Sequence, residues 1–303
     1  MAITNGSSNG SKSAGKPFPP GVHVPSLTWF LDTPEQEIDW EVQKKHLAFL
    51  IESGLHGSAS PRLLALLFPT PNPKNPTNQL TSTSIVVLAG TNGEAVTLSA
   101  TEKSQLVKTT RELAMSLGRP ELTVILGCGG GSTQQVIAET KLAKEAGADY
   151  ALVLVPSYFH FAMSEDAIVA FFQELATASP LPILIYNFPG VSSGLDVNSN
   201  MLETLGHHPN IVGVKLTCGG IAKVARIRSR FEPKEFCALA GQSDWMLPAI
   251  AVGGIGSITG LANIYPRACI ELYDQAVAGK TKEAEKSQIE LAAVEWGVRE
   301  GRD

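Results

Sequence analysis

The sequence predicts an α/β fold, a (β/α)8 TIM barrel with one extra helix at its C-terminal end. Eight apolar runs alternate with segments of helical periodicity along the 303 residues, and a barrel of this kind takes about 250 residues. The runs are almost continuously apolar, as parallel strands buried on both faces require. A doubly wound sheet is the alternative because it alternates similarly, but no GxGxxG motif opens a helix after the first strand.

Local signals place each element. Gly54 ends the first helix, and Ser99 with Glu102 forms a capping box at the start of the next. The expected strands are 21–30, 85–89, 122–127, 150–155, 183–187, 210–217, 236–240 and 254–258. The expected helices are 39–53, 99–117, 132–146, 164–177, 197–206, 221–231, a short one from Ser243, 265–278 and the extra helix 282–298.

Composition excludes several classes of partner. The formal net charge of −5 argues against binding to nucleic acid or to an anionic membrane. No apolar run approaches the roughly 20 residues of a membrane span. The four cysteines have neither CxxC nor metal-ligand spacing, so we expect reduced thiols, a cytoplasmic location, and no metal or cofactor.

Two segments fall outside the regular pattern. Residues 1–16 are rich in Ser, Gly and Asn and lack an apolar signal region, so we expect a disordered tail over 1–20 and a barrel domain over 21–303. Residues 58–84 interrupt a helix-to-strand connection that usually has about 2–6 residues. This insertion should lie on the face opposite the active site, packed on the barrel, packed on a neighbouring subunit, or disordered; a retained intron is a further explanation.

One lysine ends a strand of otherwise apolar residues. Lys215 follows the run 211–214, where burial would disfavour its ammonium form. A desolvated amine is the nucleophile that imine chemistry needs. The alternative is that the side chain passes the strand end and reaches solvent.

Other polar residues fall at the same end of neighbouring strands. Thr91 and Asn92 follow the second strand, Tyr158 the fourth, and Tyr186 the fifth. Barrel enzymes build their active sites from these positions, so we expect the side chains to surround one opening together with Lys215. Taken singly, Tyr186 would be an ordinary core tyrosine. The glycine-rich stretch 127–131 is interpreted as a strand-to-helix turn rather than a phosphate site.

Four motifs in order make the resemblance specific. The chain resembles the dihydrodipicolinate synthase/N-acetylneuraminate lyase superfamily, and the similarity extends from Gly21 to the end apart from the insertion. The motifs are Gly90-Thr91-Asn92-Gly93-Glu94, Tyr186-Asn187-Phe188-Pro189, Gly213-Val214-Lys215, and the last-strand stretch 254–258 followed by Asn263 and Pro266.

The resemblance implies a class I, pyruvate-dependent aldolase, commonly a tetramer built as a dimer of dimers. It implies that Lys215 forms the imine and Tyr186 moves the proton. Thr91 would link Tyr186 to a Tyr158 that comes from a neighbouring subunit. We expect the substrate-binding residues to be Gly90, Thr91, Asn92, Ser192, Ser193, Gly241 and Ile255, with the two serines lining a small neutral pocket.

The loop after Pro189 distinguishes branches of the superfamily. Dihydrodipicolinate synthases carry an arginine there, whereas residues 190–194 of this chain contain no cation. The chain is more similar to fungal 4-hydroxy-2-oxoglutarate and 2-keto-3-deoxy-sugar-acid aldolases, including the L-threo-3-deoxyhexulosonate aldolase. We therefore expect cleavage of a 4-hydroxy-2-oxo acid to pyruvate and an aldehyde. The alternatives are a dihydrodipicolinate synthase and a catalytically silent barrel that binds a 2-oxo acid.

Overall fold

Eight parallel strands close into a barrel in the order β1-β2-β3-β4-β5-β6-β7-β8. The structure is a computed structural model and describes residues 17–53 and 85–301. The predicted (β/α)8 class with an extra C-terminal helix is confirmed. The strands are β1 Gly21–Pro25, β2 Ile85–Leu88, β3 Thr123–Cys128, β4 Tyr150–Leu154, β5 Ile183–Asn187, β6 Ile211–Leu216, β7 Cys237–Ala240 and β8 Gly256–Ile258.

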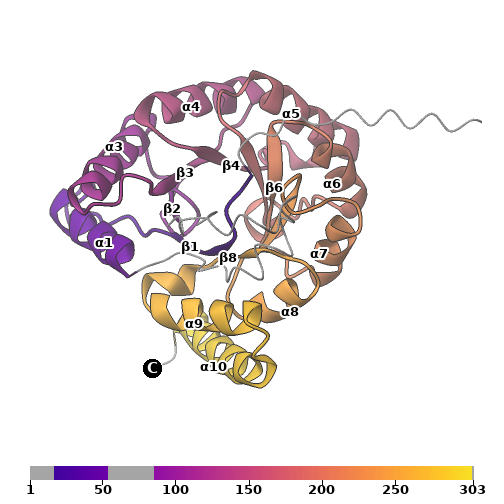
Figure 1. Ribbon diagram of the computed structural model, residues 1–303. Coiled ribbons are helices and arrows are strands. Elements are labelled where there is room, and N and C mark those ends of the chain that lie inside the picture. The colour runs from indigo at the N-terminus through magenta and orange to yellow at the C-terminus, as the bar shows by residue number, and fades with distance from the viewer. Residues whose placement is uncertain (1–16, 54–84, 302–303) are drawn as a thin grey trace, which may run out of the picture.

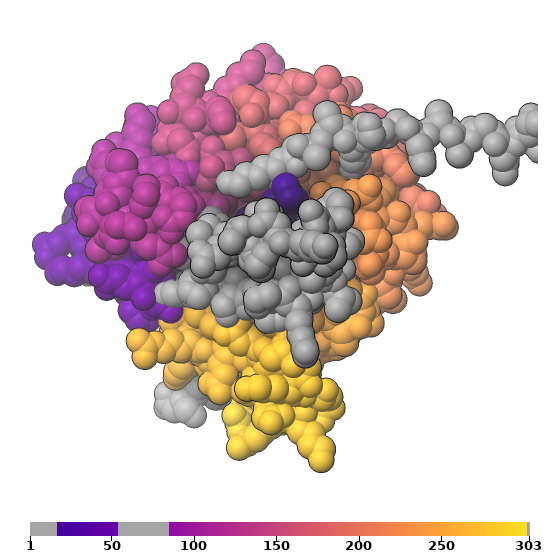
Figure 2. All heavy atoms as spheres, viewed as in Figure 1, coloured from indigo at the N-terminus to yellow at the C-terminus, as the bar shows by residue number. Residues whose placement is uncertain are grey.

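Helices surround the strands as an outer ring, and the last helix packs on the outside of that ring (Figure 1). In the space-filling view the C-terminal helical residues form a yellow lobe at one side of the barrel (Figure 2). No helix in the described ranges is long and apolar enough to cross a membrane. The α-helices are α1 Trp40–Glu52, α3 Ala100–Ser116, α4 Thr133–Ala146, α5 Glu165–Ala178, α6 Ser199–Gly206, α7 Ile221–Arg228, α8 Met246–Ala251, α9 Pro266–Val277 and α10 Thr281–Glu300. Short 3-10 turns are η1 His160–Ala162, η2 Pro189–Val191 and η3 Gly260–Asn263.

Two layers of apolar side chains form the core. The larger layer lies between the strands and the helices and includes Leu47, Phe172 and Leu202. The smaller layer fills the inside of the barrel with side chains such as Ile125 and Leu239. Successive strand residues alternate between these layers, so every second residue of a strand faces the barrel interior.

The barrel end at which the strands begin, here called the floor, is closed by residues that precede β1. Phe18 is buried and lies edge-on to the rings of His23 and Tyr150. The Tyr150 hydroxyl donates to the carbonyl of Pro17 at 3.3 Å. Our predicted tail over 1–20 is therefore wrong for residues 17–20, because the ring of Phe18 removes more apolar surface from water inside the barrel than a free tail would. Residues 1–16 lie outside the described ranges.

Four helices start within one residue of their predicted ranges, whereas three other boundaries differ from the prediction. Ser99 and Glu102 form the expected capping box, while Asp39, Ser132 and Ser164 cap three other helices. The first strand ends at Pro25 rather than at residue 30, because proline has no N–H with which to continue the ladder. The last strand starts at Gly256, and α8 starts at Met246 rather than at residue 243. The predicted insertion 58–84 falls within residues that the structure does not describe.

Candidate active site

Lys215 lies inside the barrel near the end at which the strands finish, here called the mouth. It is paired in register with Tyr186 of β5 and Leu239 of β7, and only 2% of its surface is exposed. Its Nζ lies 4.1 Å from the centroid of the Tyr186 ring. The side chain therefore does not reach solvent, and the face of an aromatic ring stabilises its charge when it is protonated.

Tyr186 connects the lysine to the turn that follows β2. Its side chain is buried, and its hydroxyl lies 3.2 Å from Thr91 Oγ1. Lys215, Tyr186 and Thr91 thus form a continuous series of an amine, a phenol and a hydroxyl from three different strand ends. Such a series can form an imine and move a proton beside it.

The turn that carries Thr91 is held close to the barrel by neighbouring backbone. A Cβ on Gly127 of β3 would meet the Ala89 carbonyl oxygen at 1.8 Å, so only glycine allows this approach. Thr28 Oγ1 donates to the Gly93 carbonyl at 2.8 Å. Within the described residues the N–H groups of Thr91 and Asn92 donate to no acceptor. Two unpaired N–H groups in one turn are suited to hold an anion.

Gly90 and Asn92, two of the predicted substrate positions, lie in this same turn. Gly90 is buried, and its carbonyl accepts the N–H groups of Gly93 and Ala95. The amide of Asn92 lies against Gly260 after β8, where a Cβ would come within 2.8 Å of its nitrogen. Both residues are therefore part of the mouth.

The loop after β5 is fixed by Asn187. Its Oδ1 accepts the N–H of Val197 at 2.9 Å, and its Nδ2 donates to Asp196 at 2.8 Å. Although burial raises the pKa of Asp196, hydrogen bonds from Lys223 and Asn187 hold that pKa below its usual value. Sequence analysis gave Asn187 no role, although its position directly after Tyr186 at the strand end could have indicated one.

Ser192 and Ser193 occupy that loop in different environments. Ser192 is 1% exposed, and its hydroxyl has no hydrogen-bond partner among the described residues. Ser193 has a positive φ of 52° and is exposed. An unpaired buried hydroxyl is costly unless a water or a ligand pairs with it.

Gly241 follows β7 on the other side of Lys215. Its N–H donates to the Leu216 carbonyl at 2.8 Å, and a Cβ at this position would lie 2.0 Å from Thr217 Oγ1. Thr217 lies two residues beyond Lys215 and therefore on the same face of the strand. Its buried Oγ1 has no partner within the described ranges. Sequence analysis missed Thr217, which the period of two in β6 would have found.

Ile255 is the predicted site residue that the structure does not bring to the mouth. It precedes β8, donates to Ala238, and accepts the N–H of Gly21 at the start of β1. Ile258, at the end of β8, is buried inside the barrel at the mouth end. The glycines at 253, 254 and 256 hide the start of this short strand in the sequence, so the sequence alone favours the earlier isoleucine over Ile258.

Tyr158 also lies apart from the other catalytic candidates within this chain. It is 78% exposed, and its ring lies edge-on to Phe159. No hydrogen bond joins it to Thr91 or Tyr186 in the described structure. A single chain therefore brings together Lys215, Tyr186 and Thr91, but not Tyr158.

Other candidate sites have their polar groups engaged by the protein itself. In the glycine-rich turn, Gly129 N–H donates to Glu139 and Gly131 N–H to Gln135, which leaves neither group for a phosphate. In the described residues no group of three His, Cys, Asp or Glu side chains converges as a metal site would require. All four cysteines are free thiols, and burial raises the pKa of Cys128, Cys237 and Cys269.

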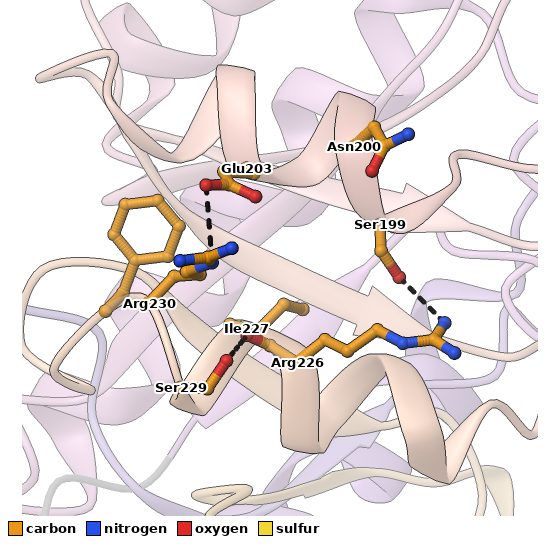
Figure 3. Close-up of a pocket in the computed structure, with 8 residues that line it drawn as sticks. Ser199, Asn200, Glu203, Arg226, Ile227, Ser229 and Arg230 are labelled. Carbon is orange, nitrogen blue, oxygen red and sulfur yellow. Dashed lines mark hydrogen bonds and ion pairs between the residues drawn. The ribbon is translucent and has the colours of Figure 1, made fainter.

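A small hollow of about 170 Å³ lies outside the barrel, between α6 and α7 (Figure 3). Arg226 donates to Ser199 at 3.2 Å, and Arg230 pairs with Glu203 at 3.3 Å. None of its lining residues belongs to a strand, so the hollow is separate from the mouth. These residues are Ser199, Asn200, Glu203, Arg226, Ile227, Ser229, Arg230 and Phe231.

Comparison with known proteins agrees with this geometry. The model of the dihydrodipicolinate synthetase family matches residues 78–298. The chain belongs to this family. The resemblance drawn from the four motifs is thereby confirmed.

Individual members of the family include fungal proteins. The chain is 38% identical to an Emericella nidulans protein named "Probable 4-hydroxy-2-oxoglutarate aldolase, mitochondrial", over 93% of this chain and 82% of that protein. It is 35% identical to a Hypocrea jecorina protein named "L-threo-3-deoxy-hexylosonate aldolase", over 92% and 82%. A solved structure of a dihydrodipicolinate synthase family protein from Coccidioides immitis superposes with a TM-score of 0.75 at 32% identity, covering 92% of this chain and 79% of that one.

Proposed function

We propose that this family member cleaves a 4-hydroxy-2-oxo acid to pyruvate and an aldehyde through an imine on Lys215. The protein is a carbon–carbon lyase of the aldolase type, as its family and the names of its relatives agree. The observation that carries the proposal is the buried Nζ of Lys215, 4.1 Å from the ring of Tyr186, whose hydroxyl lies 3.2 Å from Thr91.

The reaction follows from these positions. The Lys215 amine adds to the C2 ketone and loses water, which leaves an iminium that accepts electrons. Tyr186 takes the proton of the C4 hydroxyl while the C3–C4 bond breaks, and the electron pair of that bond forms an enamine. The aldehyde departs, C3 takes up a proton, and water adds to C2 to release pyruvate and the free amine. Thr91 exchanges the proton with Tyr186 through their contact.

The substrate carboxylate has a matching partner in the turn after β2. The unpaired N–H groups of Thr91 and Asn92 would hold it, in a turn that the Gly90 carbonyl closes by accepting the N–H groups of Gly93 and Ala95. The rest of the substrate then extends between Ser192 and Gly241, which follow the strands on either side of Lys215. The hydroxyl of Ser192 lacks a protein partner within the described residues and would pair with a substrate hydroxyl.

The nature of the aldehyde partner follows from the loop after β5. Residues 190–194 contain no cation, so a second carboxylate lacks the bidentate contact that arginine would give. A neutral polyol aldehyde fits this wall better. The names of the Emericella and Hypocrea relatives point to the two substrates that we propose to compare first, 4-hydroxy-2-oxoglutarate and L-threo-3-deoxyhexulosonate.

A substrate panel tests this function. Pyruvate release should be measured from several 2-keto-3-deoxy acids and from 4-hydroxy-2-oxoglutarate, with Lys215→Ala as the control. We expect release with at least one acid and none above background with Lys215→Ala. Formation of the dihydrodipicolinate synthase product from pyruvate and aspartate semialdehyde would instead support the synthase alternative. Binding of pyruvate without cleavage of any acid would support a silent barrel.

We also propose that the enzyme works as an oligomer, a homotetramer, in which Tyr158 completes the site of a neighbour. Tyr158 lies with Phe159 and Phe161 on the segment after β4, and all three aromatic side chains are exposed. Clustered exposed aromatic residues are typical of protein interfaces. No contact joins Tyr158 to the proton series of its own chain within the described residues.

Subunit mixing tests this arrangement. Tyr158→Ala and Lys215→Ala should each be nearly inactive alone. In mixed oligomers some sites would combine an intact Lys215 with a neighbour's intact Tyr158, so activity should return on mixing and re-association. No return of activity, in a mixture that sedimentation shows to contain both variants, would contradict the shared site.

We also propose that one barrel domain extends to residue 303 and carries an insertion at 58–84. A transcript that joins Gly57 directly to Ile85 would show that this insertion is a retained intron. We propose the cytoplasm as the compartment, since all four cysteines are free thiols. Two fungal relatives carry mitochondrial names, so cell fractionation is the deciding measurement.

A further inference from the structure

The extra helix α10 carries two buried polar side chains. Gln288 is 9% exposed and Glu295 is 7% exposed, although α10 packs outside the ring of helices against α8 and α9 (Figure 1). Glutamate is almost never buried without partners, because leaving a carboxylate unpaired away from water is expensive. The partners of these two side chains therefore indicate what α10 does.

Both side chains bind the loop that joins β7 to α8. Glu295 Oε2 accepts the N–H groups of Ser243 at 2.8 Å and of Asp244 at 3.0 Å, and also the Ser243 hydroxyl. Gln288 accepts the N–H of Leu247 at 2.7 Å and donates to the Ser243 carbonyl at 2.8 Å. Trp245, which precedes α8, provides no side-chain cap. Gln288 therefore binds an N–H in the first turn of α8 that a local capping residue would otherwise bind, while Glu295 binds two N–H groups of the loop before that helix.

This loop forms the wall of the mouth beside Lys215. It starts at Gly241, which donates to the Leu216 carbonyl and lies directly against Thr217. Only Gln242 separates Gly241 from Ser243. A shift of Ser243 therefore displaces the residue that closes one side of the mouth next to the lysine.

The closed strand order indicates which part of a substrate meets this wall. In an eight-stranded barrel β2 lies across from β6, so the turn with Thr91 and the strand with Lys215 lie on opposite sides of the mouth. With the carboxylate at the turn and C2 at the lysine, the atoms from C4 onward extend away from the turn. They lie between the loops that follow β5 and β7, the two neighbours of β6.

We infer that Glu295, supported by Gln288, is a positioning residue that fixes the β7–α8 loop as the wall for the substrate atoms beyond the pyruvyl group. This inference rests on the proposed aldolase function. It assigns Glu295 no contact with the reacting atoms. It predicts that loss of the carboxylate weakens binding of the whole substrate while pyruvate alone still forms its imine with Lys215.

The test separates these two effects. Wild type, Glu295→Ala and Glu295→Gln are compared for borohydride trapping of pyruvate and for kcat and KM with the acid that the panel identifies. We expect undiminished trapping by Glu295→Ala at saturating pyruvate and a KM raised roughly tenfold or more, since the hydrogen bonds that hold Ser243 and Asp244 are lost. Glu295→Gln retains an acceptor oxygen, so its KM should lie between those of wild type and Glu295→Ala. Should Glu295→Ala fail to fold, Glu295→Gln and Gln288→Ala carry the same comparison.

A control at the floor excludes a general effect of lost stability. Asp149 likewise accepts a backbone N–H, that of Val124 at 2.9 Å, and also binds Arg111, but where β3 and β4 begin. Asp149→Asn should lower the melting temperature and leave KM unchanged. The inference about Glu295 is wrong if Glu295→Ala keeps the wild-type KM, or if it loses trapping in parallel with cleavage. Either result leaves the proposed aldolase function standing. A wild-type enzyme that neither traps pyruvate nor cleaves any acid overturns the proposed function with it.

Discussion

The mouth and the floor of this barrel differ in what their buried polar groups offer to a ligand. At the floor, His23 is fully buried and lies 3.1 Å from the Pro19 carbonyl, and Tyr150 donates to Pro17. At the mouth, the buried hydroxyls of Ser192 and Thr217 have no partner among the described residues. The floor also keeps two unpaired polar atoms, His23 Nδ1 and Thr123 Oγ1, but Phe18 closes that end of the barrel. The unpaired hydroxyls of the mouth instead follow β5 and β6, at the end of the barrel that carries Lys215.

This difference shows where the chain has been shaped for a ligand. Unpaired buried hydroxyls reduce stability, and a bound molecule with its own hydroxyls restores their hydrogen bonds. The same barrel therefore has a floor that contributes to folding and a mouth prepared for a polar substrate. Substitutions at the mouth should therefore alter activity with little effect on stability. Substitutions at the floor should alter stability with little effect on activity.

The largest effect is expected at Lys215. Lys215→Met should lower kcat by roughly 10⁴-fold or more, because the covalent step has no substitute. Steady-state pyruvate release measures this loss. Lys223→Met is the matched control, since Lys223 lies on α7, the helix that follows the strand of Lys215, and its amine is paired with Asp196. A comparable loss with Lys223→Met would contradict the assignment of the imine to Lys215.

Tyr186→Phe should reduce kcat by about 10²–10⁴-fold, because proton transfer by a positioned side chain contributes that much. The ring beside Lys215 is kept and only the hydroxyl is removed, so trapping of pyruvate by borohydride should continue. Measuring kcat and trapping on the same preparation distinguishes a loss of proton transfer from a loss of imine formation. If trapping and turnover disappear together, Tyr186 is needed for imine formation and not only for cleavage.

At the floor, His23 should make the protein sensitive to acid. Burial lowers the pKa of His23 to about 3, against the opposing effect of its hydrogen bond to Pro19. The folded state keeps the ring neutral while the unfolded chain protonates near pH 6.5, so stability is full above that pH and falls as the pH drops toward 3. Between pH 7 and 4.5 this one group should remove about 3 kcal/mol from the free energy of unfolding.

Urea denaturation of wild type and His23→Gln at both pH values measures this contribution, because the remaining titrating groups are common to both proteins. The variant should lose about 3 kcal/mol less than wild type on acidification. Equal losses in the two proteins would show that His23 is not held neutral by the floor.

The smallest expected effect belongs to Thr91. Thr91→Val keeps the shape of the side chain and removes the hydroxyl that lies 3.2 Å from Tyr186. We expect kcat to fall about tenfold, the value of roughly one hydrogen bond, with the melting temperature unchanged. Thr123→Val provides the floor counterpart, since Thr123 is buried and its hydroxyl has no partner among the described residues; it should leave kcat unchanged.

The sequence predicted most of the fold because local signals specified it. The fifth strand is confirmed over its whole predicted range, 183–187, and a helix begins after the expected cap at Ser99. The sequence also predicted that Tyr186 and Lys215 lie side by side, since they stand near the ends of the fifth and sixth strands, which are neighbours in a parallel barrel.

The remaining features depend on contacts between residues distant in the sequence. Phe18 is placed by Tyr150, and the start of α8 depends on Glu295, which binds Ser243. The close approach of Ala89 to Gly127 is likewise a contact between two strands. No local period or propensity encodes such pairs, which is why the tail boundary, the start of α8 and the position of Ile255 were predicted incorrectly.

The most direct test of the central claim is chemical trapping. Wild-type protein is incubated with pyruvate and sodium borohydride, digested, and analysed by mass spectrometry. The proposed function predicts one reduced pyruvyl group per chain, on the peptide that contains Lys215, and none on Lys215→Met. An unmodified Lys215 peptide at saturating pyruvate, or a pyruvyl group on a different lysine, would contradict it.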